Sequence, residues 1–225
     1  MIAPPKTPEI DHRTIKLLVG LIAFFLPILT DWFALPDKIT SVSAAYFAGD
    51  WPRSIFTGFL FAIAAFLAAY NGRTRPEMFA AKAAAVAAFL IAMYPCACDG
   101  RTNEIIAGVH YVAAAVMFVV LAFFCWKFFL RAVDKARRDP QLRMQAHTRA
   151  AIYAICGAII VVSIGTLALN LVVEMSVPGD RFIFWYEAAA LMAFGVSWFT
   201  ASHIFPWINA PQERFSPMRA DNPAS

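Results

Sequence analysis

The chain has 225 residues, of which 60% are hydrophobic and 15% aromatic, whereas only 15% are charged. Soluble domains carry about 25% charged residues, so this composition excludes an ordinary soluble fold and favours a membrane protein. The net charge of +4 comes from Lys and Arg beside apolar segments, which predicts anionic lipid head groups, and not nucleic acid, as the partners of this charge.

Six apolar segments follow one another along the chain, and each is long enough or nearly long enough to cross a hydrocarbon core of about 30 Å. They cover residues 15–34, 54–70, 79–97, 105–129, 150–173 and 182–205. The sequence therefore predicts an all-α polytopic membrane bundle of six transmembrane helices. We expect a six-helix domain over 15–205, with an N-terminal tail over 1–14 and a C-terminal tail over 206–225.

The basic residues fall on alternate connections, which predicts the orientation. Fifteen of the nineteen Lys and Arg residues lie in the two tails, in the second and fourth connections, or at the helix ends beside them. The other side holds only Lys38, Arg53, Arg101 and Arg181. By the positive-inside rule, both termini are predicted to be cytoplasmic, in a plasma (inner) membrane protein that spans the membrane several times.

The connections differ in character. The first apolar segment is as long as a full span and has no cleavage site after it, so we expect an uncleaved signal anchor. The first outer loop, 35–53, mixes small hydroxyl and aromatic residues and is expected to be interfacial or re-entrant. The fourth connection, 131–148, is expected to extend the fourth helix and then turn at Pro140, and the Pro-rich tail from Pro206 to be extended or disordered.

Polar groups within the spans are costly in a bilayer, so they are the candidates for function. At about 1.5 Å per residue, His110 lies roughly 8 Å below the outer end of the fourth helix, and Glu187 lies equally deep in the sixth. Near the same level the sequence places Asp31, Asp99, Asn170 and Glu174. Acids of several helices and one imidazole are thus predicted in the outer third of the bundle.

Three interpretations of this outer cluster remain open. His110 and Glu187 could act as general acid and base, or bind a metal ion together with Asp99. Alternatively, Glu187 pairs with His110 or with the hydroxyl of Tyr111 and only joins two helices. A role in substrate or proton translocation is the third.

Cys96 and Cys98 are predicted at the outer end of the third helix, whereas Cys125 and Cys156 are predicted nearer the cytoplasm. A bridge across a single residue closes a small ring, so free thiols are expected, and Cys98 is a weak candidate for a soft metal beside Asp99 and His110. No two histidines lie at one level within the spans, and no Lys lies at mid-span, so neither haem nor retinal is expected as a cofactor.

Several stretches resemble an uncharacterised bacterial six-helix integral membrane family. The longest match is SVSAAYFAGDWPRSIFTGFLFAIAAFLAAYNG, covering the first outer loop and the second helix. The others are CDG at 98–100, HYVAAAVMF at 110–118, RAAIYAICG at 149–157 and FWYEAAALMAFGVSW at 184–198. The resemblance covers nearly all six helices, although Ala45 and Phe47 replace tyrosines of the family pattern.

More remotely, the helix order, the first outer loop, the fourth-helix His and the sixth-helix Glu resemble eukaryotic membrane proteins of the DRAM and Sfk type, which are associated with lipid handling. This resemblance implies a site formed by Ser41, Ser43, Asp99, His110 and Glu187. We therefore expect a plasma-membrane protein with a polar pocket at the outer face that interacts with membrane lipids. The alternatives are a non-catalytic accessory subunit of a larger membrane complex, with other membrane-protein subunits as partners, and a small transporter.

Overall fold

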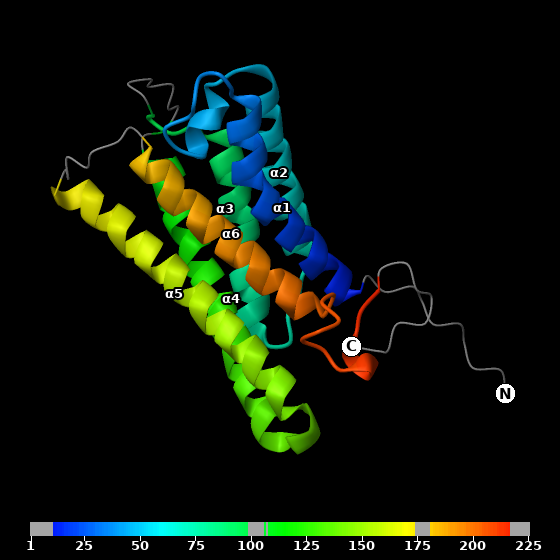
Figure 1. Cartoon of the computed structure of the whole chain (residues 1–225). Coiled ribbons are helices and arrows are strands. Elements are labelled where there is room, and N and C mark those ends of the chain that lie inside the picture. The colour runs from blue at the N-terminus through cyan, green and yellow to red at the C-terminus, as the bar shows by residue number, and fades with distance from the viewer. Residues whose placement is uncertain (1–10, 99–105, 107, 174–180, 217–225) are drawn as a thin grey trace.

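A computed structural model of the chain describes residues 11–98, 106, 108–173 and 181–216 (Figure 1). Within these ranges the chain forms six long helices, three short 3-10 helices and no strand. The long helices are α1 (His12–Phe33), α2 (Asp50–Ala69), α3 (Arg75–Met93), α4 (Val109–Arg138), α5 (Arg143–Val173) and α6 (Phe182–Ser202). The short ones are η1 (Ser43–Tyr46), η2 (Pro140–Leu142) and η3 (Pro211–Glu213). All six long helices are long and apolar enough to cross a membrane, which confirms the predicted fold class.

Local chemistry explains where the helix ends differ from the predicted spans. α1 begins at His12 because the Asp11 carboxylate caps it, accepting the Arg13 N–H at 2.9 Å. α3 ends at Met93 because Tyr94 precedes a proline and adopts an extended conformation. α4 continues to Arg138 before η2 turns the chain into α5, which confirms the expected helical extension and turn.

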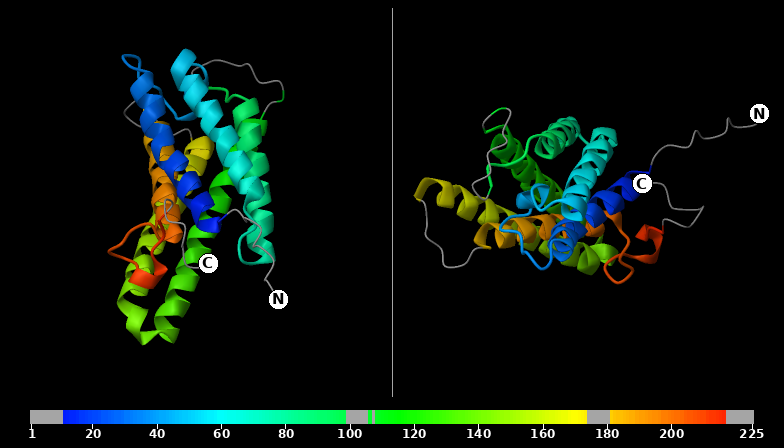
Figure 2. Two further views of the ribbon diagram at one scale, coloured as in Figure 1. Left: turned by 90° about the vertical axis from the view of Figure 1, so that its right-hand side faces the viewer. Right: turned by 90° about the horizontal axis from the view of Figure 1, so that it is seen from above.

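The helices form a ring in chain order, in which each one packs against its two sequence neighbours and α6 closes the ring against α1. The view from above in Figure 2 shows α6 flanked by α1 and α5. The α1–α6 crossing is close at Gly20 and Gly195, where a Cβ built on Gly195 would lie 2.8 Å from the Gly20 carbonyl oxygen. Small residues at such crossings let two backbones approach, as in other membrane bundles.

The two ends of the bundle differ. We call the end that carries the start and finish of the described chain the terminal end, and the opposite one the loop end. At the terminal end, Arg13 Nη1 donates to the Glu213 carbonyl oxygen at 3.2 Å. The expectation of an extended or disordered tail is wrong for residues 206–216, because Phe215 is buried and its N–H donates to the His203 carbonyl oxygen at 3.1 Å.

Aromatic side chains fill the centre of the ring. Trp198 of α6 contacts Tyr70 and Phe124, with ring centroids 5.3 and 5.4 Å apart, and all three side chains are at most 1% exposed. Phe194 continues this layer toward the loop end and Phe128 toward the terminal end. The layer lies between two cavities, since Phe194 lines the one nearer the loop end and Phe128 the one at the terminal end.

Candidate functional site

The connection between α1 and α2 folds back over the loop end of the ring and binds the beginning of α6. The Phe184 N–H donates to the Thr40 carbonyl oxygen at 3.0 Å. Ser41 is buried, and its hydroxyl oxygen accepts the Ala44 N–H at 3.0 Å, which holds the start of η1. This loop therefore contributes backbone and hydroxyl groups to the interior of the bundle, and its interfacial or re-entrant position in a membrane stays a prediction.

His110 is held at both ring nitrogens. It is the second residue of α4, which begins after Gly108, a residue in the left-handed region with φ of 81°. Its Nδ1 lies 2.8 Å from the Tyr94 carbonyl oxygen, and its Nε2 lies 3.0 Å from Ser43 Oγ. Because a carbonyl only accepts, neutral His110 carries its proton on Nδ1, so Nε2 accepts the hydroxyl proton of Ser43.

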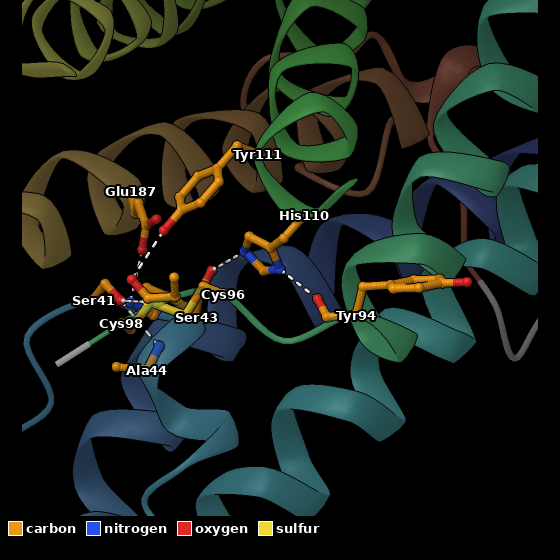
Figure 3. The surroundings of a disulfide bond; sticks show 11 residues. Ser41, Ser43, Ala44, Tyr94, Cys96, Cys98, His110, Tyr111 and Glu187 are labelled. Carbon is orange, nitrogen blue, oxygen red and sulfur yellow. Dashed lines mark hydrogen bonds between the residues drawn. A yellow bond between two sulfur atoms is a disulfide. The ribbon is translucent and has the colours of Figure 1, made fainter. Parts of the chain in front are cut away.

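Glu187 reaches the same loop from α6. Its Oε2 accepts the Val42 N–H at 2.7 Å, and the Ser43 N–H also donates to the carboxylate. Figure 3 shows Ser43 between His110 and Glu187, with Ser41 beside it. The structure thus brings together four of the five predicted site residues, Ser41, Ser43, His110 and Glu187, and Ser43 contacts both His110 and Glu187.

This cluster closes one end of an apolar cavity of about 60 Å³ inside the ring. Among the described residues that line the cavity, only Ser43 and Glu187 are polar. The remaining lining is aliphatic and aromatic, including Leu26, Leu60 and Met117. An apolar lining with a few converging polar groups is typical of sites for mostly apolar ligands, and a cavity of about 60 Å³ holds only a short part of such a ligand.

Cys96 and Cys98 form a disulfide, so the expectation of free thiols at these positions is wrong. The bridge lies in the segment that follows the end of α3, and its two Cα atoms are 5.3 Å apart, within the usual range for a disulfide. Cys98 Sγ lies 3.8 Å from Ser41 Oγ, so the bridge packs against the polar cluster. In this oxidised form Cys98 offers no thiolate to a soft metal.

The predicted metal ligands do not all lie in the described part of the chain, because Asp99 is outside it. Glu174, another acid predicted near this level, is outside it as well. Among the residues that the structure describes, no three His, Cys, Asp or Glu side chains gather in a way that could hold a metal ion. Metal binding by Asp99, His110 and Glu187 therefore stays a prediction.

The other polar residues predicted near this level take different positions. Asp31 forms an ion pair with Arg181, whose guanidinium carbon lies 4.2 Å from the Phe184 ring centroid. Asn170 lies in the last turn of α5 and is partly buried. The Tyr111 hydroxyl donates to the Ala97 carbonyl oxygen at 3.0 Å and so attaches α4 to the segment that carries the disulfide.

Sequence reasoning missed a second polar region, at the terminal end. Its basic residues indicate only topology in the sequence, yet Lys16 and Arg149 are buried at 7% and 3% exposure. The acidic Glu77 is buried there as well. Helical spacing contained a signal for Lys16, which lies three residues before Val19 and seven before Ala23 on the buried face of α1. Glu77 follows Thr74 by three residues, the spacing of a helix capping box, and it accepts the Thr74 hydroxyl proton.

Together, the six apolar helices define a polytopic integral membrane protein, and the polar cluster gives it a candidate site at the loop end of the bundle. Comparisons of the chain with protein-family models, with curated proteins and with solved structures gave no match. The resemblance to a bacterial six-helix family therefore stays a prediction.

Proposed function

We propose that this membrane protein binds a membrane lipid at its loop end, with the polar cluster facing the lipid's polar part. The orientation predicted from the basic residues puts this end at the outer face of a bacterial plasma membrane. The observation that carries the proposal is the cavity of about 60 Å³, which is apolar except where Ser43 and Glu187 close it.

The chemistry of the cluster suits a ligand that is apolar with one polar end. Burying Glu187 and Ser43 beside hydrocarbon costs free energy unless both are hydrogen-bonded, and both have such partners in the loop or in α4. The cluster is thus fixed before any ligand arrives, which lowers the entropy cost of binding. A hydrocarbon chain is the ligand part that the remaining lining of the cavity favours.

The Ser43–His110 contact also bears on whether the protein transforms its ligand. A hydroxyl within about 2.6–3.2 Å of an imidazole nitrogen has the spacing of a nucleophile and its base, and here a backbone carbonyl orients the imidazole. An experiment on lipid binding should therefore also record whether the bound lipid is cleaved.

The two alternatives make different use of the same bundle. For an accessory subunit, the cluster only joins α4, α6 and the first loop, and the exposed apolar helix faces bind other subunits. For a transporter, a path must open through the aromatic layer of Tyr70, Phe124 and Trp198, which fills the centre of the ring in this structure.

The test is native mass spectrometry of protein purified in mild detergent, which records lipids and partner subunits in one spectrum. We expect a co-purifying lipid that is reduced at least about tenfold in His110→Gln and Glu187→Gln, since each hydrogen bond to a charged or polarised group contributes about 1.5–3 kcal/mol. Thr57→Val is the matched control, because the Thr57 hydroxyl bonds only to the carbonyl of Arg53 in its own helix.

A stoichiometric protein partner together with unchanged lipid in both variants would support the accessory subunit and contradict lipid binding. If both variants fail to fold, Ser43→Ala tests the site instead. It removes a single partly buried hydroxyl and keeps the hydrogen bond from the Val42 N–H to the Glu187 carboxylate. Lipid that stays bound to folded Ser43→Ala and to folded His110→Gln would contradict the proposed site.

A further inference from the structure

A second cavity, of about 510 Å³, opens at the terminal end between the start of α1, the second half of α4, the start of α5 and η3. We call it the terminal basin. Seven of its described lining residues are Lys or Arg and three are Asp or Glu. The basin lies on the far side of the aromatic layer from the proposed lipid site, so it is a separate feature of the molecule.

The three carboxylates of the basin are already engaged by neighbouring groups. Glu213 pairs with Lys135 and also accepts from Arg149 Nη1, at 3.0 Å. Asp134 pairs with Arg138 one turn further along α4, at 2.9 Å. Asp139 accepts the N–H of Gln141 at 3.1 Å and caps η2. These three acidic side chains therefore do not neutralise the remaining Lys and Arg residues of the basin.

Lys16 is the cation that stands out. Its side chain is buried at 7% exposure, and it lines the basin. Among the described residues its Nζ has neither a hydrogen bond nor an ion pair, and it lies 5.9 and 5.8 Å from the ring centroids of Tyr70 and Phe128. Aromatic faces offset only part of the cost of burying an ammonium group, which is large unless an anion or hydrogen-bond acceptor is present.

The charges around Lys16 make its position more favourable for an anion. Arg13, Arg73 and Arg131 act on it electrostatically, against Glu77 alone on the acidic side. Glu77 is itself bound by Arg131 and by the Arg73 N–H. An anion in the basin would therefore enter a region where basic side chains outnumber acidic ones, seven to three among the described lining residues.

We propose that the terminal basin binds a phosphate group, with Lys16 at its floor and Arg13 and Arg73 at its rim. Lys and Arg bind phosphate through charge-assisted hydrogen bonds, and the cavity has room for a phosphate with its substituent. The positive-inside rule explains exposed cations such as Arg137, but it gives no reason for an inward-facing Lys16 on the buried face of α1. The phosphate belongs either to a phospholipid head group or to a soluble compound.

The experiment uses the full chain in phosphatidylcholine nanodiscs, with two probes. Equilibrium dialysis measures binding of labelled inorganic phosphate, and native mass spectrometry measures retention of phosphatidic acid added to the bilayer. We expect at least one probe to bind, and Lys16→Met to weaken it at least about tenfold, because the variant loses a charge-assisted hydrogen bond to the phosphate. Arg137→Met is the matched control, since Arg137 is an exposed cation of α4 outside the basin.

Each outcome decides one question. Phosphate binding in the absence of phosphatidic acid would assign a soluble ligand, whereas retention of phosphatidic acid alone would assign a lipid head group.

Lys16→Met replaces a buried charge with an apolar side chain of similar length, so the fold should persist. Arg73→Gln, an exposed change that leaves the Arg73 backbone bond to Glu77 intact, should weaken binding as well. Binding of neither probe, or equal weakening by Lys16→Met and Arg137→Met, would overturn the proposal.

Discussion

Glu213 attaches the C-terminal segment to the bundle through Lys135 and Arg149. Burial by itself would raise the pKa of Glu213, but the hydrogen bonds from Lys135 and Arg149 outweigh it and lower the pKa to about 2. Burial, followed by the charge of Arg149, lowers the pKa of nearby His203 to about 3. The terminal end thus contains an acid and an imidazole that both resist protonation in the folded protein.

These two groups predict that the terminal end is stable at neutral pH and loses stability on acidification. The pKa of His203 falls from 6.5 in its ordinary state to about 3, and that of Glu213 from 4.5 to about 2. In both windows the unfolded chain binds more protons, so stability falls as pH falls, first between about 6.5 and 3 and then between about 4.5 and 2. Limited proteolysis of the C-terminal segment across this pH range measures the effect.

Two substitutions separate the contributions of these groups. His203→Gln should remove the part of the pH dependence above about 4.5, where only His203 titrates. Glu213→Gln should expose the segment already at neutral pH, because Arg149, at 3% exposure, loses its charged partner. Cleavage that shows no pH dependence in the unchanged protein would contradict this account of both groups.

At the scale of elements, the α1–α6 crossing closes the ring and brings α6, with Glu187, next to the first loop. The two backbones meet where Gly20 and Gly195 face each other, and a Cβ on Gly195 would also lie 2.8 Å from Phe24 Cβ. Since one obstacle is a backbone oxygen and the other a Cβ fixed to the backbone, neither can turn away as the end of a flexible side chain could. This crossing therefore sets how closely α1 and α6 approach.

Gly195→Ala should accordingly destabilise the bundle by about 1–3 kcal/mol, the usual cost of overpacking a tight interior. The midpoint of unfolding in detergent, followed by circular dichroism, measures the change. Gly165→Ala is the control, because a Cβ there meets nothing within 4 Å and Ala favours a helix more than Gly does. Equal midpoints for the two variants would show that the α1–α6 contact is looser than described.

At the scale of the whole molecule, the distribution of basic residues predicts that the terminal end faces the cytoplasm and the loop end faces outward. Cysteine labelling in intact cells can test this, because the four native cysteines are either buried or in the Cys96–Cys98 disulfide. Lys38→Cys, exposed at the loop end, should react with a membrane-impermeant maleimide. Arg137→Cys, exposed near the terminal end, should react only after permeabilisation, and the reverse pattern would invert the topology.

The six spans could be predicted from the amino-acid sequence, because about 20 apolar residues are needed to cross a bilayer and each apolar run meets or nearly meets that requirement. Helical rise also gave the depth of Glu187, about 8 Å into α6, but the expected depth of His110 was wrong, because α4 begins only at Val109 and His110 lies at its end. An even number of crossings places the ends of the chain together, and the Arg13–Glu213 contact agrees with this. The length and hydropathy of a segment depend only on consecutive residues, so these features could be predicted without knowing how the helices pack.

Which side chains meet depends on the packed structure, because rotation of a helix about its axis and the path of a loop are set by contacts far apart in sequence. The tertiary structure brought Ser43 to His110 across 67 residues and Val42 to Glu187 across 145. It closed the Cys96–Cys98 bridge, where spacing alone favoured free thiols. It also turned Lys16 toward the interior and packed residues 206–216 on the bundle. Lys16 and Glu213 of this C-terminal segment therefore both line the terminal basin.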